Sequence, residues 1–478
     1  MAEKEAAEMA IQSRKDNMAE WYPEVVQKAE MADYAPVGGC MVMRPYSYAI
    51  WERIRSIFDS MIKETGHKNA YFPLFIPESF LKKEADHFSG FTPEVAWIEQ
   101  KEGEGERYAL RPTSETIIYD SYSKWIRSWR DLPLLLNQWC NIVRWETKVT
   151  KPFLRTREFL WQEGHTAHET EEDAEKEARM ILNMYIDLIE NYLAVPVIAG
   201  RKSESEKFAG ALRTYTMESL MPDGKALQMG TSHNLGQNFA IAFNVKYFDQ
   251  DMKEKHVWST SWGISTRLIG SIIMTHGDDK GLILPPRIAP TQMVVVPIYR
   301  TKEREGVLKA SCEMLKKLDG FRVHLDDRDS YTPGWKFNEW ETKGVPLRIE
   351  IGPKDIAKKQ VMLVRRDTGE KEAVKLTHLE KKVSEVLEAV QGNLLKRARR
   401  FLNDNTREAT NFEDFQKAIK DRKMVKAKWC GEGSCEEEIK DMTAADIRAL
   451  PLEPKKVSGK CVKCGKPAKE EAYFARAY

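Results

Sequence analysis

The 478-residue sequence predicts an α+β protein: a large domain with a mainly antiparallel sheet, then a small α/β domain and a small cysteine-bearing α/β C-terminal domain. Strand-like runs up to about residue 265 are joined by hairpins and long excursions, without the strand–helix alternation of a parallel sheet. Three prolines between Leu284 and Pro290 mark a boundary, beyond which strands and helices alternate. At about 150 residues per domain, the length agrees with three domains, for which we predict the bounds 1–285, 286–395 and 396–478.

The N-terminal part of the large domain is predicted to hold a short helix and an arm that ends near Pro36. Residues 1–20 are charged and rich in alanine, and they contain no apolar run of the length found in a secretory signal. A longer helix follows the segment from Met43 to Trp51. It is indicated by apolar residues at helical spacing, namely Ile50, Trp51, Ile54, Ile57, Phe58, Met61 and Ile62.

The rest of the large domain is predicted to hold four strands and one long helix. The helix covers Glu169 to Leu193 and has acidic residues in its first turns, where the helix dipole favours them. The strands are expected at residues 71–76, 134–143, 240–245 and 258–263.

The small α/β domain is predicted from a buried apolar run that begins at Gln292. Its strands are expected at residues 292–298, 321–325, 347–351 and 361–364, and its helices at residues 303–318 and 335–343. A last helix begins near His378 and leads into the cysteine-bearing domain.

Charge and hydropathy exclude several classes of protein. Lys and Arg number 75 against 73 Asp and Glu, so no global basic field draws in nucleic acid. We therefore expect no DNA partner, and any RNA contact has to come from local patches. No run of 18 apolar residues occurs, so we expect no membrane partner and a cytoplasmic location.

Four of the seven cysteines form two pairs near the C-terminus, Cys430 with Cys435 and Cys461 with Cys464. This spacing is typical of a tetrahedral structural zinc site. A redox pair or four reduced cysteines without a ligand are the alternatives. The other three cysteines, Cys40, Cys140 and Cys312, are scattered and predicted to be free thiols.

Three short strings supply the groups that a nucleoside triphosphate needs. They are Arg144-Trp-Glu146, Arg155-Thr-Arg-Glu-Phe159 and Gly263-Ile-Ser-Thr-Arg267. Fixed guanidiniums suit the phosphates, and an aromatic ring with a guanidinium suits the two faces of a purine. We expect Arg144 at the α-phosphate, Arg155 at the γ-phosphate, Glu146 at the adenine amino group, and Phe159 and Arg267 on the two faces of the ring.

With these strings, the sequence resembles the class II aminoacyl-tRNA synthetases. Arg111-Pro-Thr-Ser-Glu115, Leu160-Trp-Gln-Glu-Gly-His165-Thr-Ala-His168 and Gln228-Met-Gly-Thr231-Ser-His233 narrow the resemblance. It is similar to the prolyl-tRNA synthetases of the form shared by archaea and the eukaryotic cytoplasm, over essentially the whole chain after residue 20. The resemblance implies a class II catalytic domain, an anticodon-binding domain and a C-terminal zinc-binding domain. It also implies a homodimer, whose interface is built around Pro45, although an ordinary core helix fits that segment equally well.

The implied reaction is formation of prolyl-adenylate from L-proline and ATP, followed by transfer of proline to the 3′-terminal adenosine of tRNA(Pro). The attacking carboxylate is already an anion, so positioning and fixed positive charge should dominate and no general base is required. Arg144 and Arg267 are the predicted catalytic residues. Mg²⁺ should bridge the phosphates. Glu218 is expected to be a solvated carboxylate at a helix end, with a contact to Mg²⁺ as the alternative.

The proline pocket is predicted largely from the resemblance. Thr113 and Glu115 point the same way from an extended segment and offer an acceptor and a carboxylate to the protonated amine. Arg144 also contacts the carboxylate of proline, and His165 is a pocket wall rather than a base. The other implied contacts are Trp161, Glu163, Phe208, His233 and Ser261 for proline, with Gln228 and Thr231 for the ribose and phosphates of ATP.

Discrimination against alanine and cysteine is expected to be weak, because each missing methylene is worth only about 1 to 3 kcal/mol. The large editing insertion of some bacterial relatives has no room between the second and third arginine strings. The sequence therefore predicts measurable mischarging.

Three further regions are assigned to tRNA or to the active site. The predicted anticodon contacts are Trp335, Glu339, Glu341, Arg348, Glu350 and Lys354, because splayed bases are read by stacking and by hydrogen bonds to their edges. The basic runs 396–400 and 420–426 either contact the phosphate backbone or form solvated helix faces. Tyr478, the last residue, can fold back toward the active site in the family.

Two other functions compete with this interpretation. A synthetase for another small amino acid, such as threonine or glycine, shares the arginine strings, but the string from Trp161 to His168 and the four cysteines argue against it. A catalytically dead relative that binds RNA or a partner protein would normally lack one of the arginines or the ring. All of these groups are present here.

Overall fold

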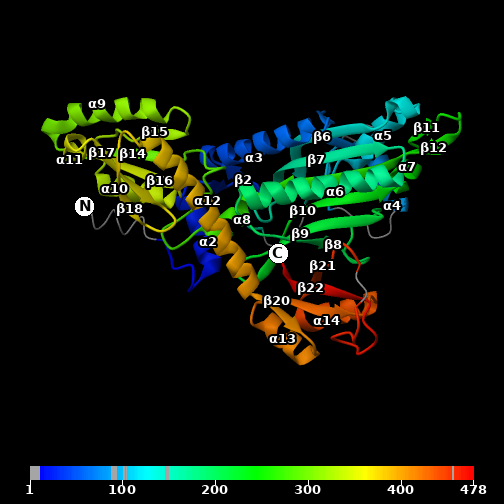
Figure 1. Cartoon of the computed structure of the whole chain (residues 1–478). Coiled ribbons are helices and arrows are strands. Elements are labelled where there is room, and N and C mark those ends of the chain that lie inside the picture. Colours follow the sequence, from blue (N-terminus) through cyan, green and yellow to red (C-terminus); the bar gives the residue numbers. More distant parts are fainter. Residues whose placement is uncertain (1–10, 88–93, 101–102, 104, 146–149, 455–456) are drawn as a thin grey trace.

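The computed structural model describes residues 11–87, 94–100, 103, 105–145, 150–454 and 457–478. Three bodies are visible in Figure 1: a large domain around a broad sheet, a small α/β domain at one end, and a third body below the sheet. The long helix α12 (Leu379–Asp404) leads from the small domain to the third body. Among the described residues, no helix combines the length and the apolar character that crossing a bilayer requires.

The sheet of the large domain is mainly antiparallel, as predicted. Strands β6 (Leu134–Val143), β7 (Glu158–His168), β13 (Trp258–Ser265), β10 (Lys225–Gly236), β9 (Arg213–Leu220) and β8 (Ile198–Arg201) pair in this order, each antiparallel to the next. The short β3 (Lys68–Asn69) adds a parallel pair at the edge beside β6. The sheet is therefore mixed only at its margins.

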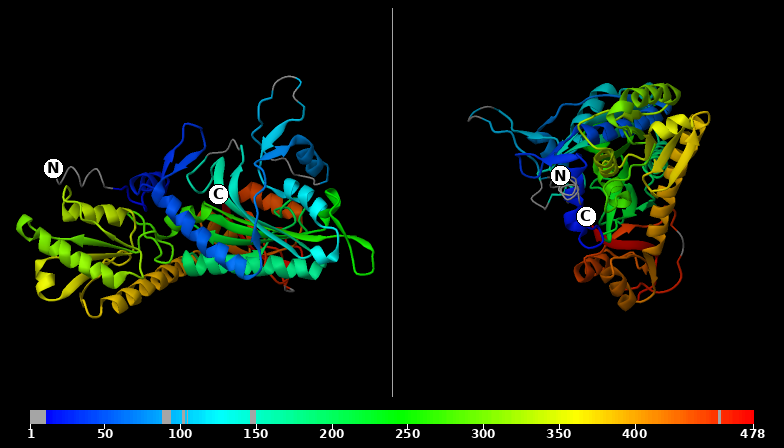
Figure 2. Two further views of the ribbon diagram at one scale, coloured as in Figure 1. Left: turned by 90° about the horizontal axis from the view of Figure 1, so that it is seen from above. Right: turned by 90° about the vertical axis from the view of Figure 1, so that its left-hand side faces the viewer.

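Two long helices, α3 (Pro45–Glu64) and α6 (Glu171–Asp187), cover one face of this sheet (Figure 2, left). Pro45 occupies the first helical position of α3, where the missing N–H costs nothing. The side chain of Thr170 caps α6 by accepting from the backbone N–H of Asp173, and a π-helical turn at Leu188–Tyr192 continues the helix. Phe58 of α3 stacks on Tyr185 of α6 with ring centroids 4.9 Å apart, so the two helices share one apolar core.

The remaining elements of the large domain lie around this sheet. The N-terminal arm forms α2 (Met18–Lys28) and a hairpin of β1 (Ala32–Tyr34) and β2 (Met41–Met43). A side lobe contains β4 (Phe75–Pro77), α4 (Glu78–His87), β5 (Tyr108–Leu110), α5 (Glu115–Trp125) and a 3₁₀ turn at Trp129–Asp131. The domain ends with α7 (Asn238–Ala242), β11 (Lys246–Phe248), β12 (Glu254–His256) and α8 (Arg267–His276).

Two of the predicted strands are corrected. Residues 240–245 were expected to be a strand, but α7 covers their first part and buries Phe239, Ala240 and Ala242 together on one helical face. Asn244 then turns the chain with a positive φ of 56°, and the strand begins only at Lys246. In the predicted strand 71–76, only residues from Phe75 onward pair, with β5. Pro73 lacks a backbone donor and precedes that pairing.

The small α/β domain has the predicted strands in the order β15 (Val323–Leu325), β14 (Met293–Pro297), β16 (Leu347–Ile351), β17 (Gln360–Arg365) and β18 (Lys371–Lys375). The last of these was not predicted, because only one of its five residues is buried. The helices are α9 (Arg304–Leu315), flanked by 3₁₀ turns at Thr301–Glu303 and Lys316–Leu318, then α10 (Pro333–Thr342) and α11 (Pro353–Ala357).

The C-terminal body joins the large sheet instead of standing apart. It contains β19 (Thr406–Ala409), α13 (Phe412–Lys420), β20 (Met424–Trp429), α14 (Gly433–Thr443), β21 (Asp446–Ala449) and β22 (Glu470–Ala477). Strand β22 pairs antiparallel with β20 and, at its end, parallel with β10. One hydrogen-bonded path therefore runs from the cysteine-bearing body into the strands of the large domain.

Candidate active site

A cavity of about 380 Å³ opens over the strands β7, β10 and β13. Arg144, Arg155 and Arg267, which lie far apart in the sequence, all line it. The other predicted nucleotide and amino-acid contacts that line the cavity are Thr113, Glu115, Phe159, Trp161, Glu163, His165, Phe208, Gln228, Thr231, His233 and Ser261. Glu146, the predicted adenine contact, lies outside the described residues.

Strand geometry explains why these side chains meet. Phe159, Trp161, Glu163 and His165 alternate along β7, so all four point to the same face of the sheet. The register of strand pairing brings residues of β13 and β10 beside those of β7 on the same face of the sheet. His165 lies opposite Ser261 of β13, and Ser261 lies opposite His233 of β10.

A glycine on the middle strand makes room for this arrangement. Glu163 lies opposite Gly263, which in turn lies opposite Thr231. A Cβ at residue 263 would lie 2.4 Å from Cζ2 of Trp161, so a side chain here would displace the indole. Gly263 thereby lets the Trp161 ring pack closely against β13, near Arg144.

The arginines reach the cavity from the ends of strands and from a helix start. Arg144 directly follows β6, and its guanidinium carbon lies 5.6 Å from the ring centroid of Phe159 and 5.8 Å from that of Trp161. Arg267 is the first residue of α8. It donates from Nε to the Leu154 carbonyl (3.3 Å) and from Nη1 to the Gln228 carbonyl (3.2 Å).

Positive charge is concentrated at this end of the cavity. Burial and then the nearby charge of Arg144 lower the pKa of Arg267 to about 10, and Arg155 acts in the same direction. Like charges held together in a partly buried place are unfavourable unless an anion joins them. The geometry therefore suits a polyphosphate.

The other end of the cavity carries a buried carboxylate and imidazole. Glu163 is 2% exposed and accepts from Ser114 Oγ, from Gln138 Nε2 (3.0 Å) and from His165 Nε2 (3.1 Å). Burial acts to raise the pKa of Glu163, but the hydrogen bond from His165 and those from Ser114 and Gln138 outweigh it and lower the pKa to about 2. Burial acts to lower the pKa of His165, and the Glu163 hydrogen bond and the charge of Glu115 outweigh it, so this pKa is raised. That His165 is a wall of the pocket and not a base stays a prediction.

The second histidine of the cavity is in the opposite state. Burial and the charge of His165 lower the pKa of His233 to about 3, so its ring is neutral. Its Nδ1 lies 2.9 Å from Thr214 Oγ1, and its ring packs on Phe208 with centroids 4.8 Å apart. Nearby, Thr113 donates to Glu115, the first residue of α5.

Several polar atoms around the cavity have no partner within the described part of the chain. They are Trp161 Nε1, His165 Nδ1 and Ser261 Oγ, and all three are buried. Buried polar atoms in folded proteins normally have a hydrogen-bond partner. Three orphan atoms in one cavity therefore point to a polar ligand.

Glu218 contradicts its prediction, because it is neither solvated nor at a helix end. It lies on β9 with no exposed surface, and it is bound by Lys202 Nζ (2.9 Å) and by Arg448 Nη2 (2.9 Å). Burial acts to raise the pKa of Glu218, but the charges of Lys202 and Arg448 outweigh it and lower the pKa. Both oxygens of its carboxylate are thus occupied by the protein's own cations.

Sequence reasoning also missed residues that complete the site. Ser114 and Gln138 bind Glu163, Thr214 binds His233, and Glu206 lines the cavity. Gln138 had a weaker signal, since it is one of three amide side chains, with Asn137 and Asn141, in a strand that is otherwise apolar. Glu206 had none, because it comes from a loop whose course the sequence does not reveal.

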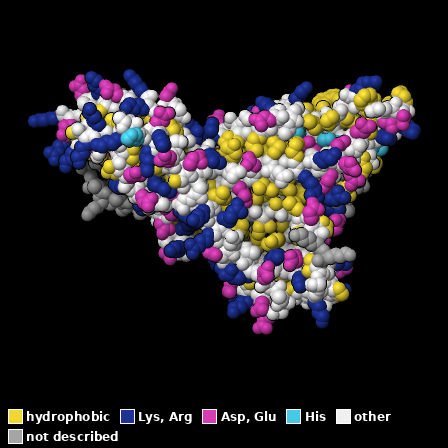
Figure 3. All heavy atoms as spheres, in the orientation of Figure 1, with side chains coloured by type: hydrophobic (Ala, Val, Ile, Leu, Met, Phe, Trp, Pro, Cys, Tyr) yellow, Lys and Arg dark blue, Asp and Glu magenta, His cyan; other side chains and the backbone are white. Residues whose placement is uncertain are grey.

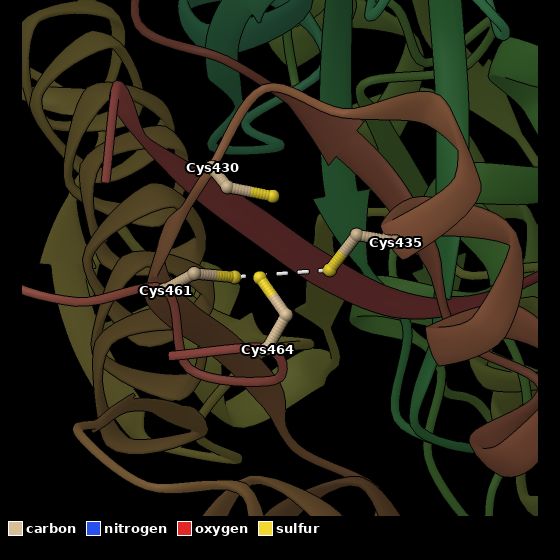
Figure 4. Close-up of side chains that lie close together, drawn as sticks. All are labelled: Cys430, Cys435, Cys461 and Cys464. Carbon is tan, nitrogen blue, oxygen red and sulfur yellow. Dashed lines mark hydrogen bonds between the residues drawn. The ribbon is translucent and has the colours of Figure 1, made fainter. Parts of the chain in front are cut away.

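The four C-terminal cysteines point toward one another (Figure 4). Their sulfur atoms all lie within 4.8 Å of one another, with Cys435 Sγ and Cys461 Sγ 3.8 Å apart. Zn–S bonds of about 2.3 Å in a tetrahedron place the sulfurs about 3.8 Å apart. The four thiols therefore fit a zinc ion, and none of the seven cysteines forms a disulfide.

The predicted anticodon residues lie on α10, β16 and α11, and most of them pair with one another or with neighbours. Arg348 binds Glu350 (2.9 Å) and Glu341 (3.0 Å), while Glu339 accepts from Arg328. Trp335 stacks on Tyr331 with ring centroids 3.8 Å apart. Lys354 of α11 is exposed.

Three protein-family models match parts of this chain. The family models that match are the tRNA synthetase class II core domain (G, H, P, S and T) at residues 97–276, the anticodon binding domain at residues 292–386, and the prolyl-tRNA synthetase C-terminal domain at residues 412–478.

Curated relatives match over nearly the whole chain. A proline–tRNA ligase of Natranaerobius thermophilus is 56% identical over 474 residues, which is 98% of each chain. One of Alkaliphilus oremlandii is 56% identical over 97% of this chain and 96% of its own. Among solved structures, the prolyl-tRNA synthetase of Cryptosporidium parvum complexed with halofuginone and AMPPNP matches with a TM-score of 0.93 and 45% identity, over 98% of this chain and 97% of that one.

Proposed function

Since the chain belongs to the family of proline–tRNA ligases, or prolyl-tRNA synthetases, we propose that its cavity activates L-proline with ATP for transfer to the 3′-terminal adenosine of tRNA(Pro). The observation that carries this proposal is the cavity itself. It joins three converging guanidiniums at one end to a buried carboxylate–imidazole pair at the other. A polyanion and a small zwitterion are the two ligands that such an arrangement suits. The form shared by archaea and the eukaryotic cytoplasm remains a prediction.

The chemistry needs no general base. A carboxylate oxygen of proline attacks the α-phosphorus of ATP, the bond to the β-phosphate oxygen breaks, and pyrophosphate leaves. Arg144 and Arg267 are the catalytic residues, because they hold fixed positive charge where negative charge develops on the oxygens around the α-phosphorus. A Mg²⁺ ion bound to ATP would neutralise further phosphate charge. Glu218 is not assigned to it, because Lys202 and Arg448 already occupy its carboxylate.

The remaining residues of the cavity bind the two substrates. ATP is held by Arg144, Arg155, Phe159, Gln228, Thr231 and Arg267, with Glu146 assigned to the adenine amino group. Proline is held by Thr113, Glu115, Arg144, Trp161, Glu163, His165, Phe208, His233 and Ser261. The orphan atoms of Trp161 and Ser261 support this assignment, since a bound substrate gives them partners.

An amino-acid panel in ATP–pyrophosphate exchange tests the activity. We expect exchange with proline well above that with threonine or glycine. Exchange with threonine or glycine in its place would establish a synthetase of different specificity. Absence of exchange with every amino acid would establish a binding protein without catalysis.

Mischarging is part of the proposal. Alanine and cysteine are smaller than proline, and each missing methylene is worth only about 1 to 3 kcal/mol of discrimination. We expect the purified enzyme to form alanyl- or cysteinyl-adenylate. A proline preference above about 10⁵ in the exchange assay would contradict this expectation.

We assign tRNA recognition to the small α/β domain, with domain bounds at 1–285, 286–395 and 396–478. The anticodon contacts are Trp335, Glu339, Glu341, Arg348, Glu350 and Lys354. The basic run 396–400 supports a role in phosphate binding, because Arg397 and Arg400 line a second, larger cavity together with Arg422. Lys and Arg side chains are seen on this part of the surface, where α12 passes toward the C-terminal body (Figure 3).

Trp335→Ala tests the anticodon assignment. Loss of one base-stacking ring costs about 1 to 3 kcal/mol of RNA binding. We expect a KM for tRNA(Pro) about tenfold higher in aminoacylation, with proline-dependent pyrophosphate exchange unchanged. An unchanged KM for tRNA(Pro) would remove Trp335 from the recognition surface.

The enzyme acts as a cytoplasmic homodimer in this proposal. The free state of all seven cysteines suits a reducing compartment. The hairpin of β1 and β2, just before Pro45, exposes the apolar side chains Tyr34 (62%), Val37 (51%) and Val42 (49%), which a second copy would cover. Sedimentation of the wild type should give a dimer, and Val42→Glu should shift it toward monomer. A monomeric wild type would contradict the proposal.

The four cysteines hold structural zinc in the proposal, which leaves no open ligand position for catalysis. Metal analysis should find one zinc per chain, and Cys464→Ser should lower that content. Zinc-free wild-type protein that unfolds at the same temperature as the loaded protein would contradict a structural role.

A further inference from the structure

One wall of the proline pocket is attached to the cysteine-bearing body. The segment from Arg201 to Phe208, here called the wall segment, begins at the last residue of β8 and precedes β9. Its last part contributes Glu206 and Phe208 to the cavity. Its first part is bonded, residue after residue, to the C-terminal body.

The attachment begins at the end of β8. Arg201 and Leu450 exchange both backbone hydrogen bonds, each 2.8 Å long, and the Arg201 side chain binds Glu470 (2.6 Å). Lys202 Nζ binds Glu218 (2.9 Å) and also the carbonyl of Arg448 (3.0 Å). These bonds fix the start of the wall segment against β21 and β22.

The attachment continues through one buried carboxylate. Glu436 of α14 is 6% exposed, and its two oxygens accept from Ser203 Oγ (2.8 Å) and Ser205 Oγ (2.6 Å). Between these serines the chain turns, because the N–H of Glu206 and that of Lys207 both donate to the Ser203 carbonyl. Glu436 therefore holds the turn from the outside, through two side chains at once.

The far end of the turn is built into the pocket. The backbone N–H of Phe208 donates to Thr214 Oγ1 (3.0 Å), and the same oxygen lies 2.9 Å from Nδ1 of His233. The Phe208 ring then packs on the His233 ring. Only two residues separate Ser205 from Phe208, so a shift of the turn moves a ring of the pocket.

We propose that Glu436 is a positioning residue for the amino-acid end of the active site, acting through Ser203 and Ser205 on Glu206 and Phe208. This inference rests on the proposed function, since it names proline as the ligand whose affinity depends on the wall segment. Glu436 directly follows Cys435, so the cysteine cluster and the pocket wall share one helix start. The C-terminal body thus takes part in amino-acid recognition without touching the substrate.

The expected signature is a change in proline affinity alone. When a wall is correctly placed only part of the time, the apparent affinity falls by that fraction, while the chemistry of the bound complex is unchanged. Glu436→Ala should raise KM for proline about tenfold, with kcat and KM for ATP within about twofold of the wild type. Glu436→Gln should recover most of the affinity, because an amide oxygen accepts from one serine and the amide nitrogen donates to the other.

The matched control is Glu438→Gln on the same helix, since Glu438 faces Lys463 and not the wall segment. It should leave all three kinetic constants unchanged. The double variant Ser203→Ala with Ser205→Ala should raise KM for proline as Glu436→Ala does, and the triple variant should add nothing further. Zinc content is measured in each variant, and an equal content excludes loss of the metal as the cause.

Two results would overturn the inference. One is an equal loss in kcat and in both KM values for Glu436→Ala, which is the mark of general destabilisation. The other is an unchanged KM for proline. Hydrogen exchange separates this test from that of the proposed function: the amides of Lys207 and Phe208 should exchange faster in Glu436→Ala, even if the wild type activates no proline. Unchanged exchange would reject the positioning role by itself.

Discussion

The active-site cavity and the charged cluster of the small α/β domain handle charge in opposite ways. In the cavity, guanidiniums approach one another, and burial together with the charge of Arg144 lowers the pKa of Arg267 to about 10. Three buried polar atoms there have no partner within the described part of the chain. In the cluster, cations and carboxylates alternate. Arg348 lies between Glu341 and Glu350, and Arg328 lies between Asp326 and Glu339.

The difference shows which region is shaped in advance for a ligand. Like charges held close together, and the polar atoms left unpaired among the described residues, lower the stability of the protein alone, and a bound substrate relieves both. The cluster is satisfied by its own residues, so under the proposed anticodon contacts RNA bases would have to replace existing partners there. Substitutions in the cavity should therefore reduce activity with little loss of stability, and substitutions in the cluster should do the reverse.

The largest effect is expected for Arg144→Ala. Loss of one fixed donor at the reacting phosphorus typically costs about 3 to 4 kcal/mol of barrier, so kcat for proline-dependent pyrophosphate exchange should fall by about 10² to 10³. The unfolding temperature should stay the same or rise. Arg144→Lys keeps the charge but not the two-pronged geometry, and its activity should lie between the two. If Arg144→Ala has a lower unfolding temperature, and its activity falls only as far as the loss of folded protein explains, the contrast between cavity and cluster would be wrong.

Arg348→Ala tests the other side of the comparison. Removing one partner from a buried ion pair leaves the remaining charges unbalanced, and the cost is about 3 kcal/mol of unfolding free energy. Chemical unfolding should show this loss, while pyrophosphate exchange with proline stays unchanged. Exposed Lys354→Ala is the control and should leave stability unaffected. An Arg348→Ala protein of wild-type stability would mean that the cluster is not self-supporting.

Much of the cavity was readable from the sequence because its signals are local. The cysteine spacing predicts a metal cluster, and the string from Trp161 to His168 carried the resemblance that placed Trp161, Glu163 and His165 in the pocket, although no strand was predicted there. The arginine strings needed no knowledge of the fold, since each carries its chemistry within a few residues. Their convergence was an inference from chemistry, and the cavity agrees with it.

The misses share a physical cause, which is dependence on partners distant in the chain. Glu218 was taken for a solvated group because one of its two charged partners, Arg448, lies 230 residues away and the other, Lys202, reaches it only across paired strands. Residues 240–245 have a strand-like composition, but burial of one helical face in the core decided their conformation. The pairing of β22 with β10 and the hydrogen bonds of Glu436 to the wall segment likewise have no signal in the neighbouring sequence.

The pH dependence of stability sharpens the comparison within the cavity. His233 has a pKa of about 3 in the folded protein against about 6.5 when unfolded, so only the unfolded chain takes up the proton as pH falls. Its contribution to stability is present above pH 6.5 and is lost as pH falls toward 3, with about 2 kcal/mol lost at pH 5. His165 has the opposite sign: its raised pKa gives stability at low pH that is lost as pH rises through the folded value.

His233→Gln isolates the first of these effects. Between pH 7 and pH 5, the variant should lose about 2 kcal/mol less unfolding free energy than the wild type. Urea unfolding at the two pH values measures it. An identical loss in both proteins would mean that His233 already carries a proton in the folded state.

The smallest effect on activity is expected at the C-terminus. Like the charged cluster it has a satisfied polar group, and like the cavity it lies near an arginine of the active site. Tyr478 donates to Asp223 (2.6 Å) and is held at the edge of β10 by the last pair of β22, so its hydroxyl is satisfied. Yet its ring lies 5.8 Å from Nζ of Lys151, on the loop that leads to Arg155. The larger cavity that it lines also contains Arg155, so the ring borders the polyphosphate end of the active site.

Deletion of Tyr478 should therefore lower the rate of activation about threefold, because the loop loses a neighbour and no catalytic charge is removed. Tyr478→Phe keeps the ring and should fall closer to the wild type. KM for ATP should carry the change, since Arg155 is assigned to the γ-phosphate. Unchanged kinetics in the deletion variant would mean that Tyr478 only packs against the protein. The tail would then resemble the charged cluster, which serves stability, and not the cavity, which serves activity.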